Sequence, residues 1–508
     1  MQSTTGSFIH KKSSIKDFIL WWGILFAACI LVRLPNFLSD SFWFDGDEAM
    51  IGIMAQDLLA GKAFPIYFYG QNYGLSIFEV ISTAVFELFI GPSPWSLKLG
   101  GLLLFSLGIT FIVRTIRQFP ISSGLFYIII VLLISYPTWY LWGTMVRGGY
   151  VTAFLFDCII FYLVFRKESS YRQLVWLGIS IGIAFESHIF ILIGILPVLG
   201  MWFLKQDKKL QKILFITTAA VVIVVLLRLT GYYEETVWNR PRTELGMEYQ
   251  KYNLDAHFKN LTYGFSNFFY YGMKLERPIW WGHLVRLFLV LSAGILLWDF
   301  LTSFRRKFYY YLFVGLSVTI YLFLISTLPV IAGRYWLGLF SGLLFWLMYV
   351  VITRYNSNIT KYVFLCLAFI SFTGIYNGPK FKRTWYEAEV NEVRAFEELY
   401  REVKKKNAKA VFITDFLIQW QWDYLYGREI PASVFTQQER TNTFLHKANK
   451  IYEESPDKMV IIGFDGMFLE MDYIPGFNDN RRAVNAKYFI HDNPKIEYIN
   501  QGRKKHQE

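Results

Sequence analysis

Apolar runs of near-spanning length constrain this chain more than any other feature of its sequence. A transmembrane helix needs about 20 predominantly apolar residues. Runs that approach or reach this length occur at roughly 17–34, 97–113, 122–142, 150–165, 174–186, 189–204, 213–230, 283–302, 308–328, 337–353 and 361–376. Because 54% of the 508 residues are hydrophobic, one soluble core cannot bury them all, whereas a series of bilayer spans can. The sequence therefore predicts a polytopic α-helical membrane protein with about eleven spans.

Basic residues predict how these spans are oriented. Lysines precede the first run, which places the N-terminus in the cytoplasm. A further run at 75–90 is ambiguous, because it is short and contains Glu79 and Glu87. If it crossed the membrane, the basic loops that follow would face outward; if it lies along the outer surface, they all face the cytoplasm, as the positive-inside rule requires. We therefore expect 75–90 to be an external juxtamembrane helix or a re-entrant segment, in an integral protein of the plasma (inner) membrane with its C-terminus outside.

This topology gathers most of the remaining polar side chains on one side of the membrane. The external segments are 35–96, 143–149, 186–188, 231–282, 329–336 and 377–508. They carry Asp45, Asp47, Glu48, Gln71, Asn72, Tyr73, Arg147, Glu186, His188, Arg240, Arg242, Arg334 and Tyr335. Intramembrane and juxtamembrane ionisable groups are costly, so their convergence on one face indicates a functional site.

The last part of the chain differs from the rest. From about residue 377 the apolar runs shorten and charge rises. Short apolar segments at 410–414 and 459–463 are typical of buried strands, and helical periodicity surrounds them. Alternating strands and helices predict a small external α/β domain over 377–508, after a transmembrane domain over 1–376.

Three carboxylates stand together just after the first span. Asp45, Asp47 and Glu48 begin a helix predicted over 47–60, in which apolar residues recur with helical spacing. The positive end of the helix dipole stabilises ionised carboxylates there. Such a group can take a proton from an attacking hydroxyl or amine, or bind a divalent cation. Helix capping explains one aspartate at this position, but it is a weaker explanation for three acids in four residues.

A series of short motifs surrounds these acids. After Asp47-Glu48 come Leu58-Leu59-Ala60-Gly61-Lys62, Phe64-Pro65, Tyr69-Gly70-Gln71-Asn72-Tyr73-Gly74 and the segment Phe89 to Leu99. The series resembles the GT-C superfamily of membrane glycosyltransferases, with family 39-like members such as protein O-mannosyltransferases and the lipid A aminoarabinose transferase as the closest branch. The similarity is specific over about residues 18–205 and loose in the later spans.

The resemblance implies a GT-C fold, a sugar donor carried on a polyprenyl phosphate, and transfer on the outer face of the membrane. It also implies a catalytic base at Asp47 or Glu48. This sequence adds Asp45, and Asp45-Gly46-Asp47 is an Asp-x-Asp pattern that holds metal in some glycosyltransferases. A divalent cation such as Mg²⁺ or Mn²⁺ on Asp45 and Asp47 therefore stays open, and the sequence indicates no other cofactor.

The expected reaction assigns roles to the other external residues. A departing polyprenyl phosphate gathers negative charge, which arginine binds well. The expected phosphate- or donor-binding residues are Arg147, Arg334, Tyr335 and His188, and the expected substrate-binding residues are Gln71, Asn72, Tyr73, Glu186, Arg240 and Arg242. The simpler interpretations are arginines that snorkel at the membrane edge, a solvated loop at 240–242 and a satisfied turn histidine.

These observations predict an inverting glycosyltransferase with a glycan, lipid or protein acceptor. An alternative is a polytopic lipid or sugar transporter or flippase. A flippase would need charges near the midplane that are reachable from both sides, whereas the candidate residues lie on one face. The net charge of +12 follows the orientation rule and indicates no nucleic-acid partner.

Overall fold

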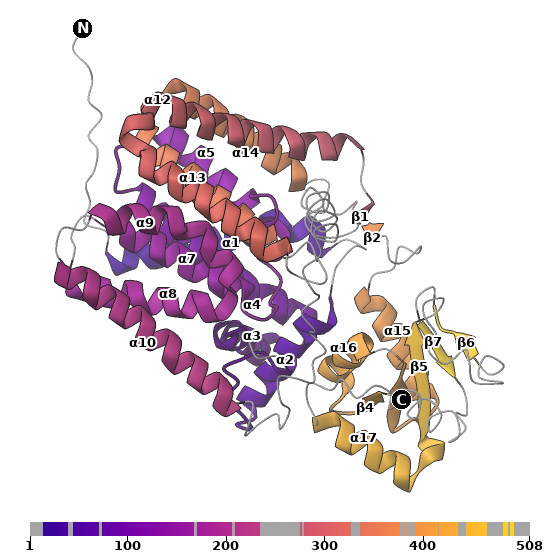
Figure 1. Ribbon diagram of the computed structural model, residues 1–508. Helices are drawn as coiled ribbons and strands as arrows, with labels where there is room; N and C mark the ends of the chain where they lie inside the picture. The colour runs from indigo at the N-terminus through magenta and orange to yellow at the C-terminus, as the bar shows by residue number, and fades with distance from the viewer. Residues whose placement is uncertain are drawn as a thin grey trace.

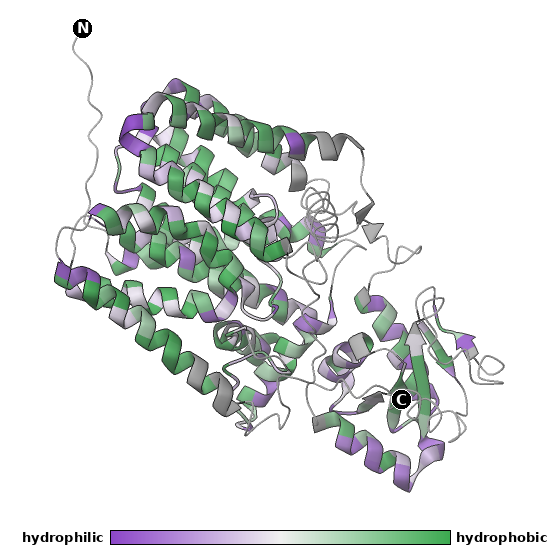
Figure 2. Cartoon of the chain, viewed as in Figure 1, coloured by the Kyte–Doolittle hydropathy of each residue, from purple (hydrophilic) through white to green (hydrophobic). Residues whose placement is uncertain are grey.

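The computed structural model describes residues 14–38, 44–70, 74–166, 170–205, 209–233, 275–276, 279–326, 336–375, 382–383, 392–414, 416–434, 443–464, 481–485 and 488–491. In these residues a large bundle of helices stands beside a smaller unit that contains a sheet (Figure 1). Hydrophobic residues run along the bundle helices, whereas α17 (Thr443–Glu454) of the smaller unit carries many hydrophilic ones (Figure 2).

Helices lie at each of the predicted apolar runs. They are α1 (Ile15–Phe37), α4 (Pro94–Ile116), α5 (Ser123–Ser135), α6 (Trp139–Trp142), α7 (Tyr150–Val164), α8 (Tyr171–Leu192), η1 (Ile193–Ile195), α9 (Leu196–Lys205), α10 (Lys209–Tyr233), α12 (Ile279–Ser326), α13 (Leu337–Arg354) and α14 (Asn358–Ile375). Among the described residues, six helical stretches are long and apolar enough to cross a membrane. The predicted polytopic α-helical fold is therefore confirmed.

The run at 122–142 is not one continuous helix, as its apolar character had suggested. It breaks into α5 and α6 around Pro137. Proline has no backbone N–H and disfavours helical geometry in the residue before it. Buried Arg33 of α1 donates to the carbonyl oxygens of Ile134 and Tyr140 at this break, so a charged side chain replaces the missing helical hydrogen bonds.

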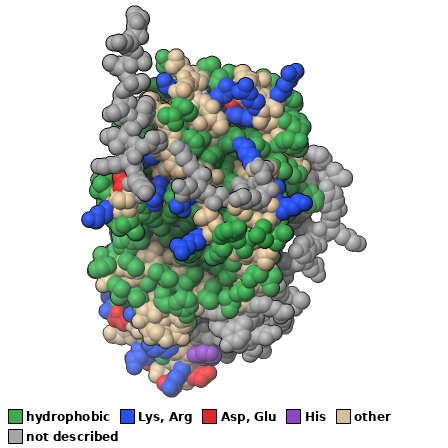
Figure 3. Space-filling model, turned by 90° about the vertical axis from the view of Figure 1, so that its left-hand side faces the viewer, with side chains coloured by type: hydrophobic (Ala, Val, Ile, Leu, Met, Phe, Trp, Pro, Cys, Tyr) green, Lys and Arg blue, Asp and Glu red, His purple; other side chains and the backbone are tan. Residues whose placement is uncertain are grey.

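The basic residues gather at one end of the bundle. Arg117 pairs with Asp17 at the start of α1, and Arg114 lies over the rings of Phe18 and Tyr162. Figure 3 looks at this side of the molecule and shows many Lys and Arg side chains among hydrophobic ones. We call it the basic end. The positive-inside rule expects Lys and Arg to gather on one side of the membrane in this way.

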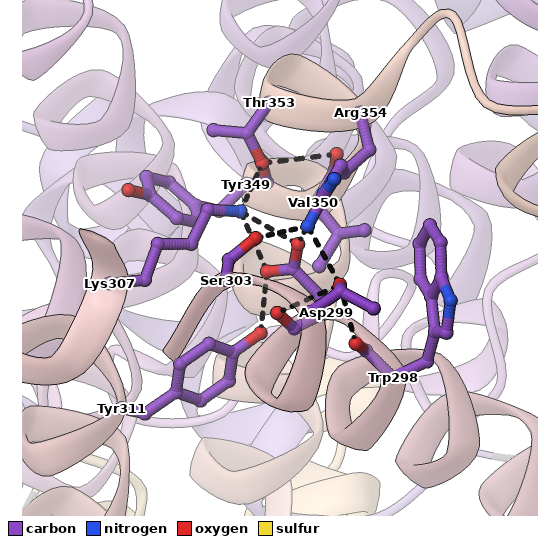
Figure 4. A network of polar contacts seen from close by, with 10 residues as sticks. Trp298, Asp299, Ser303, Lys307, Tyr311, Tyr349, Val350, Thr353 and Arg354 are labelled. Carbon is purple, nitrogen blue, oxygen red and sulfur yellow. Dashed lines mark hydrogen bonds and ion pairs between the residues drawn. The ribbon is translucent and has the colours of Figure 1, made fainter. Parts of the chain in front are cut away.

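At the basic end α12 bends sharply. In a straight helix the Cα atoms of Asp299 and Tyr311 would lie about 18 Å apart, yet the Tyr311 hydroxyl is 2.7 Å from Asp299 Oδ2. Lys307 Nζ also reaches both Asp299 oxygens, at 2.8 and 2.7 Å, and Arg354 Nε lies 2.8 Å from Oδ1 (Figure 4). The helix therefore consists of two arms that match the predicted spans at 283–302 and 308–328, and α13 joins them through Arg354.

A second change of direction occurs in α8. His188 has extended backbone angles, φ −166° and ψ 97°, in the middle of the helical stretch. Before the break α8 packs against α7 and α10, whereas α9 after it packs against α12. The break lies at the predicted turn 186–188.

Two helices occupy the first loop, where the sequence predicts them: α2 (Gly46–Leu59) and α3 (Ile77–Ile90). The outer face of α3 is apolar and exposed, with Leu88 at 68% and Phe89 at 81%, whereas Glu79 and Glu87 are buried on its inner face. This inverted pattern suits a helix that lies against lipid, as expected for 75–90. The helix predicted over 47–60 is present as α2, and every residue from Glu48 to Asp57 is buried, so its polar side is covered as well as its apolar side.

The smaller unit has the predicted α/β character. Its sheet has the order β4 (Ala432–Val434), β3 (Ala410–Ile413), β5 (Met459–Phe464), β7 (Tyr488–His491) and β6 (Arg481–Ala483). The first three strands are parallel, β7 pairs antiparallel with β5, and β6 pairs antiparallel with β7. Helices α15 (Glu392–Lys405), α16 (Phe416–Tyr426) and α17 (Thr443–Glu454) accompany the strands. A short antiparallel pair, β1 (Leu275–Glu276) and β2 (Lys382–Arg383), lies outside this sheet.

Candidate functional site

The first turn of α2 brings two aspartates onto one arginine. Asp45 is the N-cap, and its carboxylate accepts a hydrogen bond from the Glu48 N–H at 3.1 Å. Arg147 Nη1 lies 3.2 Å from Asp45 Oδ2, and Nη2 lies 2.6 Å from Asp47 Oδ2. The guanidinium also lies over the Trp142 ring, 5.6 Å from its centroid. The structure thus joins three of the residues that the sequence singled out.

Glycines bring Arg147 to this place. Gly148 and Gly149 follow it with φ of +64° and +93°, a region that side chains disfavour. A Cβ on Gly149 would lie 2.8 Å from the Ser187 carbonyl oxygen, and one on Gly74 would lie 2.5 Å from that of Gly148. The arginine loop is therefore packed backbone to backbone against the first loop and against the break in α8.

Glu79 fixes the helix that follows Arg147. Its buried carboxylate accepts hydrogen bonds from the backbone N–H groups of Gly149, Val151 and Thr152, at 3.1 to 3.2 Å. An anion at a helix N-terminus is stabilised by these donors and by the helix dipole. Burial raises the pKa of Glu79 to about 7, and the three N–H donors oppose this rise. In the sequence, Glu79 served only as a reason to doubt that 75–90 crosses the membrane, and its contact with the start of α7 was not predicted.

Glu48 has a different environment from its two neighbours. Lys98 Nζ, on α4, lies 2.5 and 2.8 Å from its two carboxylate oxygens, and the Glu48 side chain is 0% exposed. Burial raises its pKa to about 7, against the effect of the lysine. The Asp47 side chain is 21% exposed. Of these two carboxylates, Asp47 is therefore the one that is open to solvent.

Glu186 and His188 lie beside the arginine loop. The Glu186 carbonyl oxygen accepts from the Leu75 N–H at 3.2 Å, and the His188 ring packs against the Tyr150 ring, with the centroids 4.1 Å apart and the planes tilted by 35°. Both side chains are buried. Glu186 therefore contacts the first loop through its backbone, and His188 contacts the start of α7 through its ring.

The other predicted site residues lie outside the described residues. They are Gln71, Asn72, Tyr73, Arg240, Arg242, Arg334 and Tyr335.

The acids meet the requirements of a metal site poorly. The described part of the chain contains no group of three or more His, Cys, Asp or Glu side chains that could hold a metal ion. Asp45 and Asp47 instead share the positive charge of Arg147. A cation bound between them would have to displace the guanidinium, so these residues do not fit a resident divalent ion.

Comparisons with known proteins identify the fold. The chain shares its fold with ArnT. A crystal structure of ArnT from Cupriavidus metallidurans in the apo state matches with a TM-score of 0.57 and 12% identity, over 94% of this chain and 100% of that one. A structure of the same protein bound to undecaprenyl phosphate matches with a TM-score of 0.56 and 12% identity, over 93% and 99%. No family model and no curated protein matches the sequence.

Proposed function

We propose that this protein is an inverting glycosyltransferase that takes a sugar from a polyprenyl phosphate. The observation that carries the proposal is Asp47, a partly exposed carboxylate that a buried framework holds 2.6 Å from an arginine. The shared fold supports it, since the similar ArnT was crystallised with undecaprenyl phosphate. The acceptor is a glycan, a lipid or a protein.

In the proposed reaction Asp47 accepts the proton of the acceptor hydroxyl or amine. The acceptor atom forms its bond to the anomeric carbon from the side opposite the phosphate. The bond between that carbon and the phosphate oxygen breaks, and its electron pair stays on the lipid phosphate. Arg147 stabilises the Asp47 carboxylate before the step. As Asp47 becomes neutral, the guanidinium can donate to the developing phosphate charge instead.

Further residues have proposed roles in the same step. Arg334, Tyr335 and His188 would hold the donor phosphate, while Gln71, Asn72, Tyr73, Glu186, Arg240 and Arg242 would contact sugar or acceptor. The site and the α/β unit would face the outside of the plasma (inner) membrane, and the basic end would face the cytoplasm.

Asp47→Asn tests the proposal. The purified protein in lipid vesicles is given a polyprenyl-phosphate sugar and acceptor, and transfer is measured. We expect kcat to fall by about 10²–10⁴-fold, which is the usual contribution of a general base. Asp57→Asn is the matched control, because Asp57 lies at the other end of α2 and pairs with exposed Lys62. Unchanged transfer by Asp47→Asn would reject Asp47 as the base.

A further inference from the structure

The α/β unit completes the hydrophobic cluster beneath the site. Trp420 and Tyr424 of α16 pack in one buried cluster with Phe44 and Val146. Phe44 directly precedes Asp45, and Val146 directly precedes Arg147. The residues that flank the acids and the arginine therefore share one cluster with a helix from a distant part of the chain, and this helix, α16, lies beside α2 (Figure 1).

Tyr424 fits a space made for it by a glycine. A Cβ on Gly52 would lie 2.2 Å from Tyr424 Cε2, so only glycine allows α16 to approach α2 this closely. The Tyr424 hydroxyl donates to Glu87 Oε1 at 2.9 Å and accepts from the Ser93 N–H at 2.9 Å. One side chain thus ties together α2, α3 and the start of α4.

Gln421 holds the approach to the acids. Its Nε2 donates to the Phe44 carbonyl oxygen at 2.5 Å, one residue before the N-cap Asp45. Toward the other end of α2, Gln56 Nε2 donates to the Tyr424 carbonyl oxygen at 3.1 Å, and Arg428 Nε donates to Gln56 Oε1 at 3.1 Å. The contacts of α16 therefore reach both ends of α2. They fix the position of α2 along its own axis as well as its distance from α16.

We propose that Gln421 and Tyr424 are positioning residues for sugar transfer, through which the α/β unit sets the place of Asp45 and Asp47 relative to Arg147. The inference rests on the proposed function. Neither side chain touches the acids or the arginine in the contacts described, so both act through the backbone and helices that carry them. Displacement of a catalytic group by about 1 Å can lower a rate by about 100-fold. A small shift of α2 would therefore be enough to slow transfer.

Two isosteric variants test this inference in the full-length protein. Gln421→Glu keeps the size of the side chain but replaces its N–H donor, and Tyr424→Phe removes only the hydroxyl. Tyr426→Phe is the matched control, since it removes a hydroxyl from the same helix and its ring stacks on Tyr400 inside the α/β unit. Transfer kinetics and hydrogen exchange are measured on each variant and on the unaltered protein.

We expect both variants to lower kcat by about 10- to 100-fold with little change in KM, because geometry and not ground-state binding is lost. Backbone amides in the first turn of α2 should exchange faster, while those of β3 and β5 keep their protection. A loss of stability alone would instead reduce the amount of folded protein and leave kcat per folded molecule unchanged. Gln421→Asn with a partly recovered kcat would support the role of the donor.

The outcomes separate this inference from the proposed function. If the unaltered protein transfers sugar and both variants match Tyr426→Phe in kcat and in exchange, the positioning role is wrong and the transferase proposal stands. If the unaltered protein transfers no sugar, the proposed function fails. In that case the positioning role in transfer is rejected as well. If Gln421 and Tyr424 still slow the hydrogen exchange of α2, their contact with α2 is only structural.

Discussion

Lys98 Nζ lies 2.5 Å from Glu48 Oε1, and the two side chains are 4% and 0% exposed. This ion pair joins Glu48 of α2 to α4 of the bundle. The neighbouring acid, Asp47, pairs with Arg147 instead. Two adjacent acids in the same helical turn therefore lie in different environments. Glu48 is enclosed and anchors α2 to α4, whereas Asp47 keeps access to solvent.

Removal of the lysine should destabilise the protein strongly. Lys98→Met leaves a buried carboxylate without its cation, which typically costs about 3–5 kcal/mol. The double variant Lys98→Met/Glu48→Gln removes both charges, so most of that loss should be recovered. Thermal unfolding in detergent measures both effects. Lys450→Met is the control, because both side chains of its pair with Glu454 are exposed and such a pair contributes at most about 1 kcal/mol. Equal melting temperatures for Lys98→Met and Lys450→Met would contradict the prediction.

The sequence predicts the positions of helices better than it predicts contacts between residues that are far apart in the chain. The separate apolar runs at 283–302 and 308–328 correspond to the two arms of α12, which is one continuous helix with a bend between them. The positions of α2 and α3 also follow from local spacing. The contact of Glu48 with Lys98 does not, since it joins residues 50 positions apart.

The burial of α2 shows the same limit more clearly. Gln56 and Tyr424 are 368 positions apart, and nothing in the first loop indicates that a helix of the last domain covers it. Gly52 is a local trace of that contact, because its missing side chain makes room for the tyrosine ring. A single glycine in a helical pattern has too many explanations to predict a partner.

Glu87 should make stability depend on pH near neutrality. Burial raises its pKa from 4.5 to about 7, and the Tyr424 hydroxyl and Arg428 oppose the rise. The folded state then holds a proton that the unfolded state loses, so stability falls as pH rises from about 4.5 to about 7. Glu87→Gln should remove at most about 3 kcal/mol of that fall. Denaturation at pH 5 and pH 8 measures the difference, with Glu453→Gln on exposed α17 as control. An unchanged pH slope in Glu87→Gln would show that Glu87 does not titrate in this window.

The Asp299 cluster should hold the bend of α12. Asp299→Asn removes the charge that Lys307, Arg354 and the Tyr311 hydroxyl share (Figure 4). Two cations then lose their common partner, and a loss of about 3–5 kcal/mol is expected. Thermal unfolding in detergent is the measurement, and Arg306→Gln is the control because Arg306 is exposed beside the bend. Since the cluster lies at the basic end, kcat per folded molecule should stay unchanged; a specific loss of kcat would contradict a purely structural role.

Chelation should leave sugar transfer unchanged. Arg147 already supplies the positive charge between Asp45 and Asp47, and no third ligand is grouped with them in the described residues. Transfer is measured with and without EDTA, and Mn²⁺ binding is followed separately by paramagnetic resonance. Arg147→Ala is the informative variant, because Mn²⁺ binding should become detectable only when the guanidinium is gone. Loss of transfer in EDTA that added Mg²⁺ or Mn²⁺ restores would instead show that a cation displaces Arg147 during the reaction.

Cysteine labelling of intact cells should place Lys62 outside and Asn356 inside. Lys62 follows α2 at the site end and is 58% exposed, and Asn356 lies exposed in the turn between α13 and α14. Because Cys366 is exposed whereas Cys29 and Cys158 are buried, the background variant is Cys366→Ser. A membrane-impermeant maleimide should label Lys62→Cys directly, and Asn356→Cys only after permeabilisation. The two positions also test α3 itself. With the N-terminus inside, Lys62 is external whether or not α3 spans, but one additional span would move Asn356 to the outside. Labelling of both positions in intact cells would therefore show that α3 crosses the membrane, and the interfacial assignment of 75–90 would be wrong.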